Sequence, residues 1–133
     1  MLKYMLDTNI VIYTIKKRPD PVRRAFKTHE GRMCISAVTW GELVFGAEHS
    51  QQAERNLADV EAMASRLEVL PFDRKGAEHF GQVRAELYRI GNPIGPYDMM
   101  IAGHARSLGL VLVTNNTKEF EHIQGLRIEN WVV

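Results

Sequence analysis

The sequence predicts an α/β fold in which a mainly parallel β-sheet is flanked by helices on both faces. Short apolar runs, of which residues 110–113 are the clearest, have the continuous branched character of buried parallel strands. These runs alternate along the chain with longer segments of helical character. The length of 133 residues suffices for one compact domain and is too short for two, so we expect one domain over residues 1–133.

The chain begins with an expected strand and two helices. Residues 4–6 form a short apolar run that is consistent with a buried strand. Cap-type residues at 7–9 precede a helix expected over 10–15. Two prolines break that helix, and a basic helix is expected over 22–28.

The middle of the chain supplies a strand, two helices and another strand. Residues 33–36 form a second apolar run, and residues 39–47 read as a helix. The helix expected over 53–67 carries its apolar residues on one stripe, as a helix that packs against a core does. Residues 68–70 form a short strand, and Pro71 ends it or places it at an edge.

Capping residues and glycines delimit the elements of the C-terminal half. Asp73 can cap a helix that Gly91 ends. Asp98 begins a nearly all-apolar helix that Gly109 ends, and that composition predicts burial on most sides. Residues 126–131 alternate in polarity and are expected to form a last edge strand.

Composition limits the class of protein. A hydrophobic share of 45% and a charged share of 25% are typical of a soluble globular domain. No apolar run has the length of a membrane span, and the short apolar start is not typical of a signal peptide. Cys34 is the single cysteine, so no internal disulfide can form, and we expect a buried thiol in a strand. These features predict a cytoplasmic protein.

Charge is unevenly distributed although the net charge is only +1. Residues 16–32, here called the basic lobe, hold seven basic and two acidic residues, whereas residues 33–133 carry a net charge of −4. A basic lobe beside an acidic pocket suits a polyanion that is held by its phosphates. A solvated helical surface explains the lobe equally well. The candidate phosphate contacts are Lys16, Lys17, Arg23 and Arg24.

Three acidic residues stand where a parallel sheet would bring them together. Asp7 ends the first strand, Glu42 lies early in a helix and Asp98 begins another. Ligands of open α/β sheets gather outside the carboxyl ends of the strands, and carboxylates gathered there suit a hard cation such as Mg²⁺. A polar cluster follows the strand at 110–113, with Thr114, Asn116 and Glu119 as its candidate site residues.

These residues have two readings. Singly, each is a helix cap, a turn residue or a surface residue. Jointly, they predict metal-assisted phosphate chemistry, in which the ion holds a phosphate oxygen and activates a water for in-line attack on phosphorus. Glu42 or Glu119 could orient that water or complete a second metal site.

Other chemistries lack their motifs. The five histidines show no zinc-ligand spacing, and His104 is expected to be a hydrogen-bonded core residue. No Gly-rich phosphate loop follows the first strand, which argues against a nucleotide cofactor. No serine lies in a Gly-x-Ser-x-Gly setting, which argues against a serine hydrolase.

Four motifs in order resemble the PIN-domain ribonucleases, and within them the VapC toxins of type II toxin–antitoxin systems. The resemblance spans essentially the whole chain. Any one motif is weak, but four with these spacings are specific. They are Met5-Leu6-Asp7-Thr8-Asn9, then Ile35 to Leu43 with Gly46, then Ile94 to Ala102, then Leu112 to Asn116 with Glu119-Phe120.

The resemblance implies a toxin that is a Mg²⁺-dependent endoribonuclease, with Mn²⁺ as a possible substitute, and that inhibits translation. It implies cleavage of structured RNA such as initiator tRNA. It further implies a homodimer neutralised by a VapB-like antitoxin, whose C-terminal segment packs over the active site. The toxin and antitoxin form a higher hetero-oligomer that contacts DNA only through the antitoxin.

Carried onto matching positions, the resemblance assigns Asp7 and Asp98 as metal ligands and Glu42 as the next acidic residue. The family often has Asp where this chain has Asn116, so either Glu119 or Asn116 fills the fourth position. Thr114 matches a small hydroxyl position near the site.

A different class of protein remains as the alternative. A non-catalytic module with the PIN shape could bind RNA or protein through the basic lobe. The chain has acidic residues at all the carboxylate positions of the family but one, which argues against a loss of catalytic activity.

Overall fold

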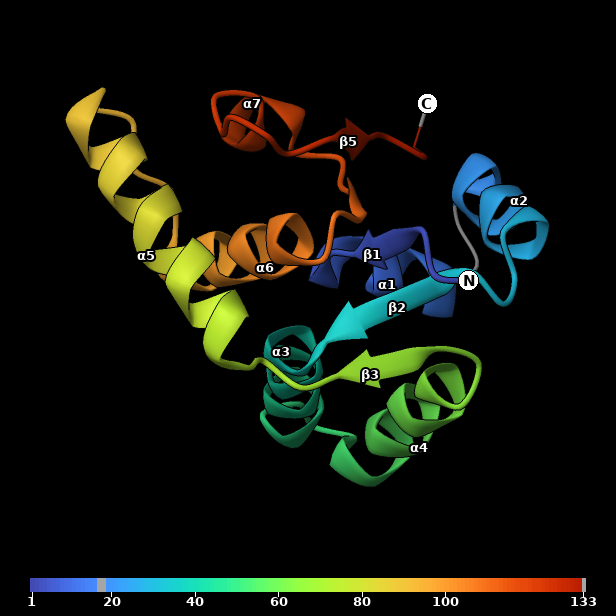
Figure 1. Cartoon of the computed structure of the whole chain (residues 1–133). Coiled ribbons are helices and arrows are strands. Elements are labelled where there is room, and N and C mark those ends of the chain that lie inside the picture. Colours follow the sequence, from blue (N-terminus) through green and yellow to red (C-terminus); the bar gives the residue numbers. More distant parts are fainter. Residues whose placement is uncertain (17–18, 133) are drawn as a thin grey trace.

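The computed structural model describes residues 1–16 and 19–132, and its centre is one five-stranded sheet (Figure 1). The described strands pair in parallel in the order β3-β2-β1-β4-β5. The predicted α/β class and parallel sheet are confirmed, and both strands expected at edges lie there. The strands are β1 (Tyr4–Leu6), β2 (Met33–Ser36), β3 (Glu68–Leu70), β4 (Val111–Val113) and β5 (Ile128–Glu129).

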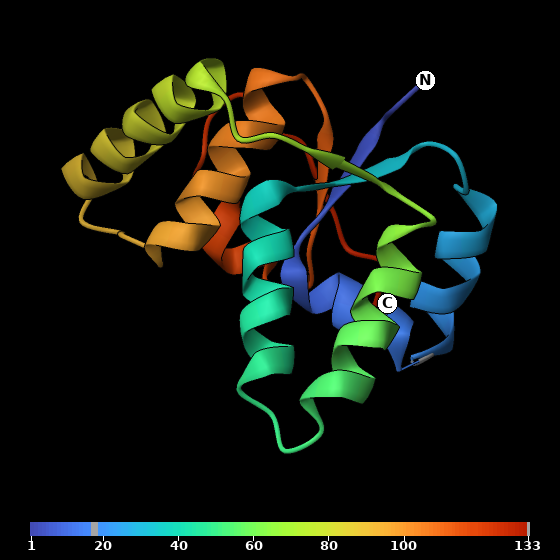
Figure 2. The same ribbon diagram turned by 90° about the horizontal axis from the view of Figure 1, so that it is seen from below.

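Helices cover both faces of the sheet (Figures 1 and 2). The first core cluster joins one face to residues of α1 (Thr8–Ile15), α2 (Asp20–Thr28), α3 (Ala37–Glu48) and α4 (Ala53–Ala64). The second joins the opposite face to residues of α5 (Arg74–Arg89), α6 (Pro96–Ser107) and α7 (Thr117–Phe120).

Residues of β1 alternate between these two clusters. Tyr4 and Leu6 pack in the first cluster, whereas Met5 packs in the second. Successive side chains of a strand point to opposite faces, so a strand covered on both sides must be apolar throughout. The buried three-residue run of β1 is therefore the feature that places it at the centre of the sheet.

The register of the central strands aligns their carboxyl ends. Leu6, the last residue of β1, pairs with Val113, the last residue of β4. The backbone N–H of Asp7 donates a hydrogen bond to the carbonyl of Val113 at 3.0 Å. Asp7 and Thr114, the residues that follow these two strands, therefore meet at one edge of the sheet.

Several helix boundaries differ from the prediction. The helix α4 ends at Ala64 rather than at residue 67. The helix α6 begins at Pro96 with Gly95 as its N-cap, so Asp98 lies in the first turn instead of beginning the helix. Proline is well suited to the first helical position because its fixed φ is close to the helical value. The N–H that proline lacks would also have no partner within the helix there. The short helix α7 was not predicted.

Two glycines end helices as predicted. Gly91 and Gly109 adopt positive φ values of 69° and 68° directly after α5 and α6. A third glycine serves packing, because a Cβ at Gly103 would lie 2.5 Å from the backbone nitrogen of Phe80. The helices α5 and α6 can therefore approach closely at Gly103.

Two predicted core residues are confirmed. Cys34 is fully buried, and this burial raises the pKa of its thiol to about 12. His104 is buried, and its Nδ1 lies 2.8 Å from the Ser36 hydroxyl. No helix among the described residues is long and apolar enough to cross a membrane.

Candidate active site

Asp7 forms the centre of the polar edge of the sheet. It is the N-cap of α1, and its carboxylate accepts a hydrogen bond from the Ile10 N–H at 2.9 Å. Only 4% of the residue is exposed, and this burial raises the pKa of the carboxyl. Hydrogen bonds from Thr114 and Ile10 oppose the shift, whereas the charges of Glu42 and Glu119 add to it.

Asp98 reaches the same cluster from α6, which packs on the opposite face of the sheet from α1. Its pKa is raised from 3.8 to about 6, first by burial and then by the charges of Glu119, Glu42 and Asp7. A hydrogen bond between the side chains of Asp98 and Glu119 raises it further. Since repulsion of this kind falls off with distance, four carboxylates from four separate segments converge on one place.

Glu42 reaches the cluster from the second turn of α3. Its Oε1 accepts a hydrogen bond of 2.6 Å from the hydroxyl of Thr8, the first residue of α1. Charge-assisted bonds of this length fix the orientation of a carboxylate. Thr8 was not singled out from the sequence, because the two residues are 34 positions apart and no local signal connects them.

The loop after β4 brings the fourth carboxylate to the cluster. The N–H of Asn116 donates to the hydroxyl oxygen of buried Thr114 at 3.0 Å. The N–H of Glu119 then bonds to the Asn116 carbonyl at 3.1 Å. The side chain of Phe120 is buried and anchors α7. The carboxylate of Glu119 thus lies within electrostatic range of the site, whereas the contact of Asn116 with Thr114 is made by its backbone.

The four carboxylates, here called the acidic cluster, form no ion pair with a basic side chain in the part of the chain that the structure describes. None of the ion pairs formed by the described residues includes Asp7, Glu42, Asp98 or Glu119. Oxygen donors with unbalanced charge suit Mg²⁺ or Mn²⁺.

The acidic cluster is not a preformed metal cage. Among residues 1–16 and 19–132, no three His, Cys, Asp or Glu side chains are arranged to hold an ion as they stand. The chemistry of the donor set fits a hard cation, but the side chains must rearrange before they can serve together as ligands. The catalytic and metal-binding roles of these residues stay predictions.

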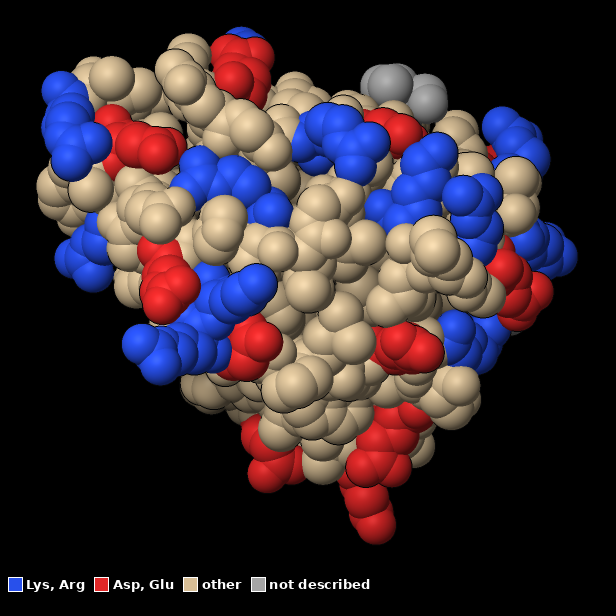
Figure 3. Space-filling view, in the orientation of Figure 1, with Lys and Arg blue, Asp and Glu red and all other residues tan. Residues whose placement is uncertain are grey.

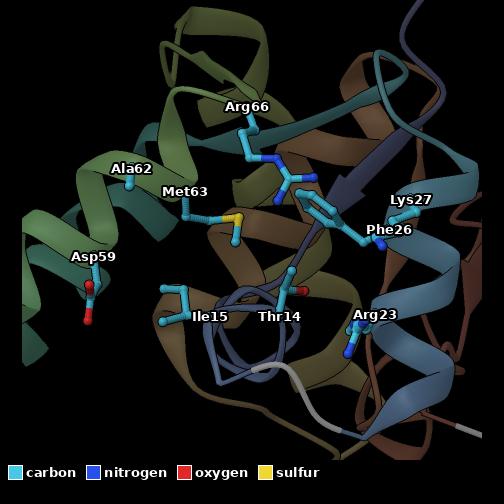
Figure 4. Close-up of a pocket in the computed structure, with 9 residues that line it drawn as sticks. All are labelled: Thr14, Ile15, Arg23, Phe26, Lys27, Asp59, Ala62, Met63 and Arg66. Carbon is cyan, nitrogen blue, oxygen red and sulfur yellow. The ribbon is translucent and has the colours of Figure 1, made fainter.

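The predicted phosphate contacts lie on or beside two surface hollows: Lys16 lines a groove together with Glu42, and Arg23 lines a neighbouring hollow. Lys16, Arg23 and Arg24 are exposed, and Lys17 lies outside the described residues. Basic side chains gather over α2 at the upper right of Figure 3. Beside them lies a hollow of about 440 Å³ between α1, α2 and α4, into which Arg66 points (Figure 4). It is lined by Thr14, Ile15, Arg23, Phe26, Lys27, Asp59, Ala62, Met63 and Arg66.

A second groove of about 290 Å³ is continuous with the acidic cluster, because Glu42 lines it. The rest of its lining is mostly apolar and comes from α1, α3 and α4. The two hollows share Ile15 and Asp59. The groove at Glu42 therefore adjoins the hollow beside the basic lobe.

Comparison with known sequences identifies the family. A PIN domain model matches residues 4–126. The tRNA(fMet)-specific endonuclease VapC of Shigella flexneri is 60% identical over 131 residues, which are 98% of this chain and 99% of that relative. Ribonuclease VapC2 of Haemophilus influenzae is 54% identical over 132 residues, which are 99% of this chain and 100% of that relative.

Solved structures agree with the sequence relatives. DNA-bound VapBC from Salmonella typhimurium matches with a TM-score of 0.94 and 60% identity, over 98% of this chain and 99% of that one. VapBC2 from Rickettsia felis, bound to a promoter DNA fragment, matches with a TM-score of 0.92 and 38% identity, also over 98% and 99%. The resemblance found in the sequence is confirmed: the chain belongs to the PIN-domain family and, within it, to the VapC ribonucleases.

Proposed function

We propose that this chain is a toxin endoribonuclease that hydrolyses phosphodiester bonds in structured RNA with the help of Mg²⁺ or Mn²⁺. Cleavage would inhibit translation in the cytoplasm. The observation that carries the proposal is the acidic cluster, which gathers four carboxylates that form no ion pair with a described basic side chain. Initiator tRNA is the first candidate substrate, because the Shigella flexneri relative is named a tRNA(fMet)-specific endonuclease.

The residues of the acidic cluster have separable roles in this proposal. Asp7 and Asp98 would hold the cation, since they stand at the centre of the mutual repulsion. A bound divalent ion would neutralise phosphate charge and activate water for attack on phosphorus. Glu42, held in one orientation by Thr8, is suited to position that water. Glu119 would fill the fourth active-site position, and Asn116 would shape the loop that carries Glu119.

A VapB-like antitoxin is proposed as the protein partner. The similar structures from Salmonella typhimurium and Rickettsia felis are VapBC complexes. The groove that begins at Glu42 is lined largely by apolar side chains, which suits an amphipathic helix of a partner. A segment laid along it would cover the acidic cluster. In this proposal the toxin is a homodimer within a larger complex with antitoxin, and DNA is contacted only by the antitoxin.

The basic lobe is proposed to hold RNA phosphates. Replacing Arg23 and Arg24 with alanine should weaken binding of uncleaved RNA and reduce the salt slope by roughly one to two units, because RNA that makes two fewer phosphate contacts releases fewer counterions on binding. The matched control replaces exposed Arg84 and Arg89 of α5. Equal salt slopes in the two double variants would remove the basic lobe from the binding surface.

The deciding experiment measures cleavage of an initiator tRNA transcript with Mg²⁺, with Mn²⁺ and with a chelator. We expect cleavage only with metal, and loss of cleavage in a folded Asp7→Asn variant. Expression with and without the neighbouring antitoxin reading frame, followed by mapping of new 5′ ends, would identify the RNA cut in cells. A folded wild-type protein that binds RNA but cuts none with either metal would instead favour the non-catalytic module.

A further inference from the structure

One hydrogen bond connects the loop after β4 directly to α1. The side-chain Nδ2 of Asn115 donates to the hydroxyl oxygen of Tyr13 at 3.1 Å, between residues 102 positions apart. Tyr13 belongs to the helix whose N-cap is Asp7, and Asn115 belongs to the loop that leads to Glu119. The bond therefore ties together two segments that each supply a carboxylate to the acidic cluster.

The helix α7, to which this loop leads, has few anchors of its own. The helix α7 has only four residues, and no side-chain hydrogen bond caps its N-terminus at Asn116. Its single buried anchor is Phe120. With one buried anchor and no side-chain cap, α7 depends on the contacts of the loop that precedes it.

The side-chain amide of Asn115 makes only part of the hydrogen bonds that it could make. Its carbonyl oxygen is buried and has no hydrogen-bond partner among the described residues. A buried acceptor without a partner lowers stability. Side chains that accept this cost occur where a local arrangement serves function. Asn115 thus differs from Thr114, whose hydroxyl serves both Asp7 and the Asn116 N–H.

We propose that Tyr13 and Asn115 are a positioning pair that holds α7, and with it Glu119, against α1 before a cation binds. The proposal rests on the proposed cation site and deepens it. The pair touches neither substrate nor cation. It keeps the segments that carry Asp7 and Glu119 together, so that less ordering of the backbone accompanies binding of the ion.

The test compares Tyr13→Phe, Asn115→Ala and the double variant. Hydrogen–deuterium exchange without metal should become faster in residues 114–120, and the Kd for Mn²⁺ measured by calorimetry should rise about 3- to 10-fold. Both single changes remove the same bond, so the double variant should be no worse than either. The control is Tyr88→Phe, which removes an exposed hydroxyl on α5 and should change neither quantity.

Additive effects in the double variant, or unchanged exchange and Mn²⁺ affinity in Tyr13→Phe, would overturn the positioning role. Tyr13→Phe keeps the packed ring, so its result stands even if Asn115→Ala fails to fold. Failure of the proposed function looks different. In that case the wild type would bind no Mn²⁺ and cut no RNA, while the exchange measurement would still report whether the pair restrains α7.

Discussion

Replacing Asp98 with asparagine should stabilise the metal-free protein while it abolishes RNA cleavage. The pKa of Asp98 rises from 3.8 to about 6 in the folded chain, a change of about 2 units. Each unit corresponds to about 1.4 kcal/mol of preference for the neutral form, which gives about 3 kcal/mol for an ionised Asp98. Partial exposure reduces this, so we expect a gain of about 2 kcal/mol at pH 7, or roughly 5 to 8 °C in Tm.

The size of this stabilisation depends on pH. The folded chain holds the Asp98 proton more tightly than the unfolded chain does, because the folded pKa is higher. The contribution of Asp98 to stability is therefore complete below about pH 4, falls as pH rises toward 6 and is constant above that value. The Asp98→Asn variant should lack this loss, so its advantage over the wild type should vanish at pH 4.

Thermal unfolding in a chelator at pH 4 and pH 7, with cleavage of initiator tRNA in Mg²⁺, tests both halves of the prediction. The control is Glu61→Gln, which neutralises an exposed carboxylate on α4. If Asp98→Asn unfolds at or below the wild-type temperature at pH 7, the carboxylates do not repel one another as described. If it still cleaves RNA, Asp98 is not an essential ligand.

Two further predictions concern residues that the sequence did not mark. Thr8→Val removes the 2.6 Å hydrogen bond to Glu42 and should slow single-turnover cleavage about 10-fold, with a Tm close to that of the wild type. A normal rate would show that Glu42 needs no orientation. Gly103→Ala should cost about 3 kcal/mol in urea unfolding because its Cβ would meet the Phe80 backbone. Gly81→Ala, where no atom lies within 4 Å, should stabilise by about 0.5 to 1 kcal/mol, and equal effects of the two changes would contradict the packing argument.

The strands could be predicted because a strand buried on both faces leaves a local signal. Residues 4–6, 33–36 and 110–113 are short apolar runs, and each contains a strand of the sheet. The meeting of Asp7 with the polar loop after β4 followed from parallel pairing alone. Sequence reasoning thus predicted which chain segments meet from the topology of the sheet rather than from any single motif.

The missed features depend on contacts between distant segments. The bond between Thr8 and Glu42 requires α1 and α3 to pack side by side, and the pair formed by Tyr13 and Asn115 spans 102 positions. The helix α7 was missed because four residues are too few to show a helical period. Such contacts are set by the packing of helices against the sheet, on which local sequence carries little information.

The unbalanced charge of the acidic cluster also limits what the site can admit. An RNA phosphate brings further negative charge and would be repelled by the four carboxylates. Two of them, Asp7 and Asp98, already have raised pKa values, in part because of the neighbouring charges. A divalent cation reverses this repulsion, so binding of RNA and binding of the ion should strengthen each other by the same factor. The basic lobe could hold RNA without the ion, but it could not bring the scissile phosphate to the cluster. RNA affinity could instead prove independent of metal while cleavage requires it. That result would show that the basic lobe supplies most of the RNA affinity and that the acidic cluster acts only on the phosphodiester bond that is cut.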